Sequence, residues 1–182
     1  MSIRRMAIFA FVLLCWCFVP NGGVAQNRVR PCDTPEGKQF DFWVGRWDLT
    51  WPAEQMGGEK GQLGHGSNTV TKILDDCIVQ EQFRFPAGNF NGTSVSVYNL
   101  RTKRWQQTWV DNQGGYLLFT GGFKDGKMEL RTPTYQRNGK TIVSRMVFRN
   151  IAKDSFDWDW QRSSDGGNTW QDVWNIHYRR KK

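Results

Sequence analysis

The sequence is poor in the residues from which most catalytic and metal centres are built. It has two histidines and four cysteines in 182 residues, and no Ser-His-Asp order, HExxH motif, clustered Cys/His set or phosphate-binding loop is visible. His177 falls on the polar face of its segment, and His65 lies in a glycine-rich stretch. We therefore expect no metal site, no catalytic residue of a known motif and no cofactor.

Long apolar runs are also lacking, and the longest one lies at the N-terminus. Arg4 and Arg5 precede an uncharged run at 6–20, which is shorter than the roughly twenty apolar residues that a membrane-spanning helix needs. Small residues end the segment. This order is typical of a secretory signal peptide at 1–25, with cleavage after Ala25. The mature protein would then be exported, either periplasmic or secreted, with no transmembrane segment.

The rest of the chain is expected to be a short linker at 26–33 and a single domain at 34–182. Its length suits one hydrophobic core. The whole chain carries a formal net charge of +8, and four of the basic residues form the terminal run 179–182. The other charges are scattered between opposite signs, so we expect a solvated surface and no nucleic-acid partner. A weak attraction to an anionic membrane surface stays open.

Two cysteines, Cys32 and Cys77, would remain after cleavage. Export would place them in an oxidising compartment, which favours a disulfide between them. Such a crosslink would constrain the unfolded chain by roughly 4 kcal/mol on the loop-entropy model. Two free thiols are the alternative, and thiol titration of the unfolded, unreduced protein would distinguish the two states.

Most of the chain shows the period-two pattern of β-strands, with closely spaced turn residues and no long helical stretch. Thr34-Pro35-Glu36 is a helix-start signal, but only a turn or two is expected to follow. We predict about ten strands, near 44–51, 66–74, 76–85, 93–99, 104–110, 116–122, 126–131, 140–149, 154–161 and 170–179. Short links make successive strands antiparallel, and closure into a barrel removes the exposed edges. The predicted fold is all-β: a ten-stranded antiparallel meander closed into a barrel, favoured over a sandwich, with a short N-terminal helical turn.

One face of most predicted strands is plainly apolar, and alternation places that face in the barrel interior. The clear interior positions, rich in tryptophan, are Trp47, Leu49, Trp51, Cys77, Val79, Phe83, Phe85, Trp105, Trp109, Met128, Leu130, Ile142, Met146, Phe148, Phe156, Trp158, Trp160, Trp170, Trp174, Ile176 and Tyr178. Four polar residues interrupt the same faces: Glu81, Gln107, Ser144 and Asp172. Burial of an ionised carboxylate costs free energy unless the group is paired with a cation or stays hydrated. Glu81 and Asp172 therefore have cationic partners, lie at the mouth of the barrel, or point into a ligand cavity.

The segment 163–170 fits the pattern Ser-x-Asp-x-Gly-x-Thr-Trp, the Asp-box of sialidase-type propellers. Asp165 can accept hydrogen bonds from turn amides, Gly167 permits a tight backbone, and Trp170 can pack beneath the hairpin. Propeller enzymes carry several copies on much longer chains, whereas this sequence has one. We interpret the segment as a structural hairpin between the last two strands and not as the mark of a glycosidase.

Gly45-x-Trp47, after a short helical segment, resembles the opening motif of lipocalins and the wider calycin superfamily. The resemblance implies a calycin-like barrel in which Trp47 packs at the closed end against a basic residue of the last strand through a cation–π contact. Arg179 and Arg180 are the candidates, and Arg179 is our choice. The second, Thr-Asp-Tyr type motif of true lipocalins is missing. A fatty-acid-binding or nitrobindin-like relative therefore fits better than a lipocalin proper.

Two longer segments, 39–48 and 103–111, together with the Asp-box, carry a closer resemblance. They are similar to an uncharacterised group of exported bacterial proteins with an FDFWVGxWD motif, a family of the domain-of-unknown-function type. The resemblance spans nearly the whole mature chain. It implies the fold and export, and it brings no activity and no catalytic residue.

An aromatic interior broken by isolated polar residues is typical of a ligand pocket. We therefore favour an exported, non-enzymatic binder of a small apolar or aromatic ligand inside the barrel. A barrel of this size can also be filled by its own side chains, so a cavity is the point to establish. The expected ligand-binding residues are four wall residues, Trp105, Trp109, Trp158 and Trp160, and three orienting residues, Glu81, Gln107 and Asp172.

Two alternatives come from other classes of protein. The first is a barrel-pocket enzyme, either an isomerase or cyclase, or a hydrolase that uses Glu81 and Asp172 as an acid–base pair. It requires the two carboxyl groups to face one cavity within roughly 5 to 10 Å. The second is a module that binds glycan or protein through exposed tryptophans. It requires Trp43, Trp51 and Trp170 to lie at the surface.

Overall fold

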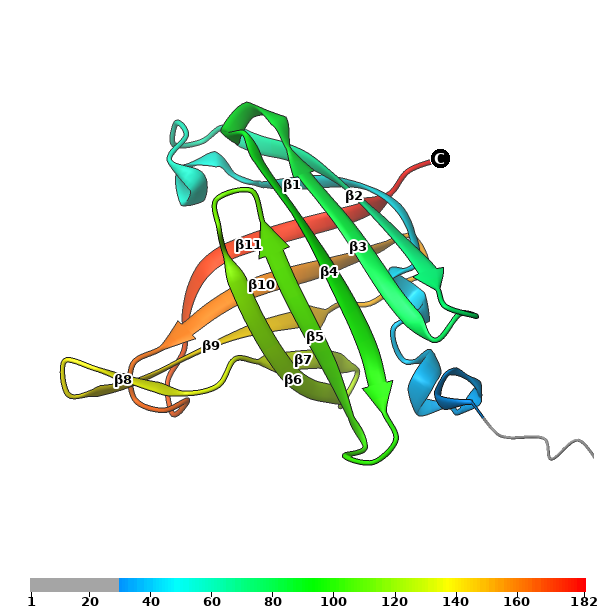
Figure 1. Ribbon diagram of the computed structural model, residues 1–182. Helices are drawn as coiled ribbons and strands as arrows, with labels where there is room; N and C mark the ends of the chain where they lie inside the picture. The colour runs from blue at the N-terminus through cyan, green and yellow to red at the C-terminus, as the bar shows by residue number, and fades with distance from the viewer. Residues whose placement is uncertain (1–29) are drawn as a thin grey trace, which may run out of the picture.

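The computed structural model describes residues 30–182 and shows an all-β protein (Figure 1). The expected signal peptide at 1–25 and part of the expected linker lie outside the described residues. Three short 3-10 turns precede the first strand: η1 (Pro31–Asp33), η2 (Glu36–Lys38) and η3 (Asp41–Trp43). The predicted short helical turn at the N-terminal side of the barrel is confirmed. No helix in the described part of the chain is long and apolar enough to cross a membrane.

Eleven strands follow in the described chain, and ten of them close into one antiparallel barrel. The strands are β1 (Gly45–Pro52), β2 (Leu63–Ile73), β3 (Ile78–Phe85), β4 (Phe90–Asn99), β5 (Arg104–Asp111), β6 (Tyr116–Lys124), β7 (Lys127–Arg131), β8 (Tyr135–Arg137), β9 (Lys140–Arg149), β10 (Ser155–Ser163) and β11 (Gln171–Arg180). Successive strands pair from β1 to β7, and the pairs β7–β9, β9–β10, β10–β11 and β11–β1 close the ring. β8 pairs with β9 and projects from the barrel as a hairpin (Figure 1). The predicted ten-stranded barrel is confirmed, and the sandwich alternative is wrong.

The segment before β1 lies at one end of the barrel, which we call the closed end (Figure 1). Its aromatic side chains form a plug that packs against the barrel interior. The plug consists of Phe40, Phe42 and Trp43. The ring of Phe40 lies 4.7 Å from that of Trp105 and 5.4 Å from that of Phe148, and Trp43 lies 5.1 Å from Phe148. Phe40 and Trp43 are 0% and 1% exposed. The closed end is therefore a packed aromatic core, as the short ring distances and the burial of Phe40 and Trp43 show.

The first and last strands meet at the closed end through Trp47. Trp47 pairs in register with Arg180, so the two side chains point to the same side of the sheet. The guanidinium carbon of Arg180 lies 4.1 Å from the centre of the Trp47 ring, and its Nη1 donates a hydrogen bond to the carbonyl oxygen of Val44 at 2.9 Å. The choice of Arg179 was wrong, because Arg179 is one residue out of register and its side chain is exposed.

Gly45 allows this arrangement in two ways. Its φ of +143° belongs to a region that L side chains rarely adopt, and a Cβ at this position would clash with the Arg180 guanidinium. Glycine is the residue that fits such a strained, close approach. The Gly45-x-Trp47 motif therefore positions the arginine that covers the indole.

A disulfide joins Cys32 to Cys77, as predicted. It connects η1 to the turn between β2 and β3, at the closed end of the barrel. β3 begins at Ile78 rather than near residue 76, so Cys77 lies in the turn and is half-buried instead of lining the interior. The side chain of Arg30 adds a hydrogen bond to the carbonyl oxygen of Asp75 at 3.1 Å. The segment before the plug is thereby fixed to the barrel.

A β-bulge in β11 overturns the predicted orientation of two residues. Trp160 pairs with Trp174 and Gln161 pairs with Asp172, so Val173 has no partner in β10. An extra residue of this kind reverses the alternation on one side of it. Trp174 consequently points inward, whereas Asp172 is exposed on the outer face, where it accepts a hydrogen bond from the Gln161 amide at 2.7 Å. Trp170, on the same side of the bulge, also lies outside the barrel.

The Asp-box forms the hairpin between β10 and β11, as interpreted from the sequence. The carboxylate of Asp165 accepts hydrogen bonds from the Ser163 and Thr169 hydroxyls, both at 2.6 Å, and from the backbone N–H of Thr169 at 3.0 Å. These bonds, first that from Ser163, lower the pKa of Asp165. Trp170 packs outside the barrel under the Arg145 guanidinium, 4.0 Å from the ring centre.

Candidate ligand-binding cavity

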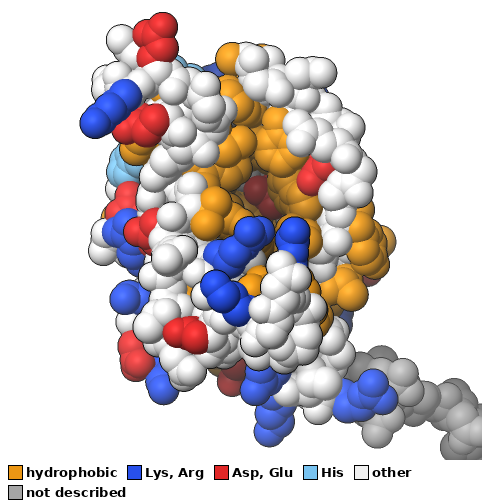
Figure 2. Space-filling model, turned by 90° about the vertical axis from the view of Figure 1, so that its left-hand side faces the viewer, with side chains coloured by type: hydrophobic (Ala, Val, Ile, Leu, Met, Phe, Trp, Pro, Cys, Tyr) orange, Lys and Arg blue, Asp and Glu red, His pale blue; other side chains and the backbone are white. Residues whose placement is uncertain are grey.

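The end of the barrel opposite the plug, which we call the open end, contains a cavity of about 320 Å³. Figure 2 looks toward this end and shows a hollow lined by hydrophobic side chains, with acidic atoms deep inside it. The cavity is bounded by Trp43, Met56, Glu81, Phe83, Phe90, Gln107, Trp109, Asp111, Leu117, Phe119, Met146, Trp158, Trp160, Val173, Trp174, Ile176 and Tyr178. The plug residue Trp43 thus separates the cavity from the closed end.

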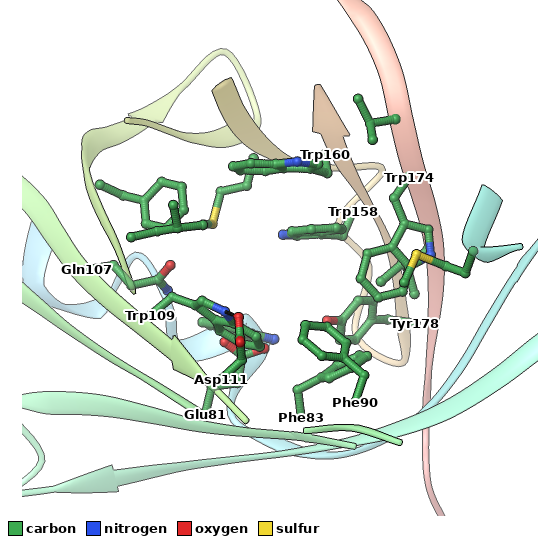
Figure 3. A pocket seen from close by; sticks show the side chains of 17 residues that line it. Glu81, Phe83, Phe90, Gln107, Trp109, Asp111, Trp158, Trp160, Trp174 and Tyr178 are labelled. Carbon is green, nitrogen blue, oxygen red and sulfur yellow. Dashed lines mark hydrogen bonds between the residues drawn. The ribbon is translucent and has the colours of Figure 1, made fainter. Parts of the chain in front are cut away.

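Indole rings form one wall of the barrel cavity (Figure 3). Trp158 and Trp160 are two residues apart on β10, so alternation points both inward. Their rings are nearly parallel, at 7°, with centroids 6.4 Å apart. Trp174 of β11 stands perpendicular to Trp158 at 5.9 Å, and its Nε1–H has no acceptor within residues 30–182. Trp109 lies across the cavity from this wall (Figure 3), and all four indoles are half-buried.

Glu81 supplies the buried carboxyl group of the cavity. It lies on β3 between Val79 and Phe83 and is 6% exposed. Its Oε1 accepts a hydrogen bond from the Asn68 amide at 2.6 Å, and its Oε2 accepts one from the Ser94 hydroxyl at 2.7 Å. Both donors are neutral, and none of the ion pairs found within residues 30–182 includes Glu81. The structural cation that sequence analysis offered as one explanation is therefore not among the described residues.

The surroundings of Glu81 shift its titration toward neutral pH. Burial raises the pKa of Glu81 to about 7, and the hydrogen bonds from Ser94 and Asn68 only partly oppose this effect. Asn68 also donates to the Tyr178 hydroxyl oxygen at 3.2 Å. Burial, and then the nearby Glu81, raise the pKa of Tyr178 well above its usual value. Tyr178 therefore stays a neutral phenol, while Glu81 changes its charge near neutral pH.

A second carboxyl group, that of Asp111, lies among the lining residues at the end of β5. Its Oδ2 accepts a hydrogen bond from the indole N–H of Trp109 at 2.9 Å, and its Oδ1 accepts one from the backbone N–H of Gly115 at 2.9 Å. Burial would raise the pKa of Asp111, but these hydrogen bonds outweigh it and lower the pKa. Asp111 is therefore ionised at neutral pH and orients the Trp109 ring.

Gln107 contributes the neutral polar group of the cavity wall. It is 3% exposed, and its Nε2 donates a hydrogen bond to the Ser96 hydroxyl at 2.9 Å. This bond fixes the amide, and Figure 3 shows the amide oxygen of Gln107 turned toward the cavity. The cavity therefore presents a fixed acceptor from β5 in addition to the carboxyl group of Glu81.

Comparison with family models gives a match over residues 34–180 to the family described as "Protein of unknown function (DUF1579)". The match includes every strand of the barrel. The chain belongs to the DUF1579 family. No curated protein matches this chain, so the site of this DUF1579 protein is interpreted from its own geometry.

In this DUF1579 protein the cavity brings together five of the seven residues predicted to bind a ligand. These are Glu81, Gln107, Trp109, Trp158 and Trp160. The other two do not line the cavity.

Asp172 lies outside the barrel because of the bulge. Trp105 is inside, but it belongs to the closed end, where it packs on Phe40 and donates a hydrogen bond to the Gln39 side-chain oxygen at 3.2 Å. No group of three or more His, Cys, Asp or Glu side chains that could hold a metal ion is found among residues 30–182.

Sequence reasoning missed Asp111 and Tyr178 as cavity groups. Asp111 lies two positions after Trp109, and the same alternation that selected Trp109 would have selected it. The predicted strand ended at residue 110, whereas β5 continues to Asp111. Tyr178 was predicted to point inward, but its hydroxyl contact with Asn68 depends on the pairing of β11 with β1 and of β1 with β2. No local sequence pattern predicts the contact between the Tyr178 hydroxyl and Asn68.

Proposed function

We propose that this DUF1579 protein binds a small, largely apolar or aromatic ligand inside the barrel and does not transform it. The observation that carries the proposal is a cavity of about 320 Å³ with indole walls and one buried carboxyl group. Ligand pockets commonly measure about 300–1,000 Å³ and combine apolar walls with a few fixed polar groups. The barrel cavity has this size and this composition.

The presence of a cavity of this size in a barrel with a packed closed end supports the proposal. Protein interiors are close-packed, and a cavity sacrifices contacts that side chains would otherwise make. The closed end shows that this chain can fill a barrel with aromatic rings, since the plug does so. At the open end, three apolar residues that line the cavity, Met56, Leu117 and Val173, are 38–42% exposed. A ligand would cover part of this apolar surface.

Within residues 30–182, the structure does not contain the arrangement of side chains that either alternative function requires. The carboxylate-pair hydrolase is wrong, because Asp172 lies on the outer face of the barrel and does not share a cavity with Glu81. A pocket isomerase would have to rely on Glu81 without that partner. The glycan- or protein-binding module needed three exposed tryptophans, but Trp43 and Trp51 are each 1% exposed. The third, Trp170, lies on the outer face, where it is half-buried and the guanidinium of Arg145 covers its ring.

We also propose that the protein works outside the cytoplasm after removal of residues 1–25. The Cys32–Cys77 disulfide supports this location, because disulfides persist in oxidising compartments. Intact mass measurement of protein recovered from the periplasm or the medium tests it. The expected mass is that of a chain beginning at Gln26 with one disulfide. Recovery of the full chain in the cytoplasm with free thiols would overturn it.

Binding is tested with N-phenyl-1-naphthylamine, an uncharged apolar dye whose emission rises in an apolar site. We expect saturable binding to the purified protein. Val173→Trp would place a large ring at the cavity and weaken dye binding by about tenfold or more. The matched control is Val95→Trp, because Val95 is 43% exposed on β4, close to the 42% of Val173, and does not line the cavity.

The control variant should bind the dye as the unmodified protein does. Native mass spectrometry of protein purified from its own host provides a second readout, because a retained small molecule would appear as added mass. The proposal fails if the dye shows no saturable binding and no retained molecule is found. It also fails if Val173→Trp and Val95→Trp bind the dye equally well.

A further inference from the structure

We propose that the ligand carries a positively charged amine, which ion-pairs with Glu81 while its apolar part lies among the cavity indoles. This inference rests on the proposed binding function and defines its ligand class. It depends on three features of the barrel cavity. These are the sign of the charges that line it, the hydrogen-bonding capacity of Glu81 that residues 30–182 leave unused, and tryptophan faces that no cationic side chain of the described chain covers.

The charge of the cavity is opposite to the charge of the protein. The chain carries a formal net charge of +8. Yet the ionisable groups among the lining residues are the carboxyl groups of Glu81 and Asp111 and the phenol of Tyr178, with no Lys, Arg or His from the described chain. The cavity therefore offers negative charge in a basic protein. A cation is the ligand charge that this arrangement complements.

Glu81 has acceptor capacity that its protein neighbours leave unused. A carboxylate has about four lone-pair positions, and the protein fills two of them, with Asn68 and Ser94. Close by, Asn68 Oδ1 is a buried acceptor with no donor within residues 30–182. Glu81, which lines the cavity, therefore keeps two acceptor positions that no donor from residues 30–182 fills. An ammonium supplies up to three N–H donors together with the missing positive charge.

The tryptophans of this protein differ in whether an arginine covers them. Trp47 at the closed end has Arg180 at 4.1 Å from its ring centre, and Trp170 on the outer face has Arg145 at 4.0 Å. Within residues 30–182, no such arginine or lysine lies over the four cavity indoles. Indole faces attract cations, more strongly where water is excluded. The cavity indoles are therefore free to receive the cation of a ligand.

Other ligand charges fit the same cavity less well. An anionic ligand would meet two carboxyl groups, and it would meet no Lys, Arg or His among the described residues that line the cavity. A neutral ligand with a hydroxyl group would find acceptors, but it would leave Glu81 either uncompensated when ionised or protonated. These two classes provide the comparison ligands for the test, because they differ from the amine in charge and share its ring.

The test uses three naphthalene compounds of similar size: the amine 2-(1-naphthyl)ethylamine, the alcohol 2-(1-naphthyl)ethanol and the carboxylate anion 1-naphthaleneacetate. Their affinities are measured by calorimetry at about pH 8, where the amine is protonated. We expect the amine to bind about tenfold more tightly than the alcohol, as a charge-assisted hydrogen bond allows. The acetate should bind more weakly than the alcohol. In Glu81→Gln the preference for the amine should fall to about twofold or less, with little change for the alcohol.

Two further measurements keep the test informative if Glu81→Gln folds poorly. Asp111→Asn is the matched acidic control, and it should reduce the amine preference less than Glu81→Gln does. In the unmodified protein the amine preference should shrink as the pH falls from about 8 to about 5.5, because Glu81 takes up a proton near its pKa of about 7. Over that range Tyr178 stays protonated and Asp111 stays ionised, since their pKa values are shifted away from neutrality.

The outcomes separate this inference from the proposed binding function. If the dye binds in the cavity but the alcohol binds as tightly as the amine, the amine inference is overturned and the binding function stands. The same holds if Glu81→Gln keeps the full amine preference, or if the preference does not change with pH. If neither the dye nor any naphthalene compound binds, both proposals fall.

Discussion

The two ends of the barrel use the same kind of residue for opposite purposes. At the closed end Trp47 and Trp105, 0% and 1% exposed, both contact the plug: Trp47 donates a hydrogen bond to the carbonyl oxygen of Trp43, and Trp105 packs on Phe40. At the open end Trp109, Trp158 and Trp160 are half-buried around a cavity of about 320 Å³. The difference is the segment that precedes β1, which enters one end of the barrel and supplies Phe40 and Trp43. Abundant tryptophan in a barrel therefore indicates neither a filled core nor a cavity until the position of a plug is known.

The two ends also differ in the sign of the charged side chains that lie beside the indole rings. At the closed end the protein provides its own cation, Arg180, which donates hydrogen bonds to backbone carbonyls while it covers Trp47. At the open end the charged side chains that line the cavity are carboxylates, Glu81 and Asp111, and no cation of the described chain covers the indoles. The closed end thus pairs its indole with a cation from the protein, whereas the indoles of the open end have no such partner within residues 30–182. Mutations can test this contrast.

The largest expected effect is a loss of stability at the closed end. Trp47→Ala removes a fully buried indole and its contacts with Phe156 and Tyr178, at 5.0 and 6.0 Å between ring centroids. Truncation of a buried tryptophan typically lowers the free energy of unfolding by about 3–5 kcal/mol. Urea denaturation followed by circular dichroism would measure it. A loss below about 1 kcal/mol would show that the closed end is not the packed core described above.

The next effect, at the open end, concerns pH. The pKa of Glu81 is raised to about 7 from an ordinary 4.5, so the folded protein holds its proton more tightly than the unfolded chain. The contribution of Glu81 to stability is therefore fully present below pH 4.5 and is lost as pH rises through 7, an effect of about 3 kcal/mol. Glu81→Gln should remove this part of the pH dependence. Urea denaturation at pH 5 and pH 8 would compare the variants, and parallel pH profiles would contradict the prediction.

Much of the cavity could be predicted from the sequence because period-two alternation holds along most strands. Glu81 and Gln107 were selected because they interrupt apolar faces, and both are buried in the interior. The alternation failed at Asp172 and Trp170 because Val173 forms a bulge. Nothing in the local sequence marks that extra residue, since a bulge depends on how two strands pair.

Position along the barrel axis was the other feature that the sequence did not reveal. Trp105 and Trp109 share one face of β5, yet the first lies at the closed end and the second lines the cavity. Which end a side chain occupies depends on the strand direction and on the plug, and both are properties of the assembled sheet. The choice between Arg179 and Arg180 depended in the same way on the register of β11 against β1.

A smaller loss of stability, from substitution of Arg180, tests the register of β11 against β1. Arg180→Ala should lower the free energy of unfolding by about 2 kcal/mol, because it removes a cation–π contact and charged hydrogen bonds to the carbonyl oxygens of Val44 and Phe42. Arg179→Ala is the matched control, since Arg179 is exposed and its nearest acidic atom lies 4.0 Å away. The control should change stability by less than about 0.5 kcal/mol. Equal losses in the two variants would contradict the cation–π assignment.

The smallest expected loss of stability comes from a tryptophan of the open end. Trp160→Ala removes a half-buried ring with two aromatic neighbours. The parallel ring of Trp158 lies 6.4 Å away and the ring of Phe119 lies 5.8 Å away, measured between centroids. Because one side of the ring already faces the cavity, the loss should be about 1 kcal/mol, well below that of Trp47→Ala. Affinity for N-phenyl-1-naphthylamine should instead fall by roughly three- to tenfold, as removal of an aromatic contact predicts. A ring that mattered only for packing would show the reverse: a large loss of stability with unchanged dye binding. Measured side by side, the two alanine variants would therefore show whether the ends of the barrel divide stability and binding between them.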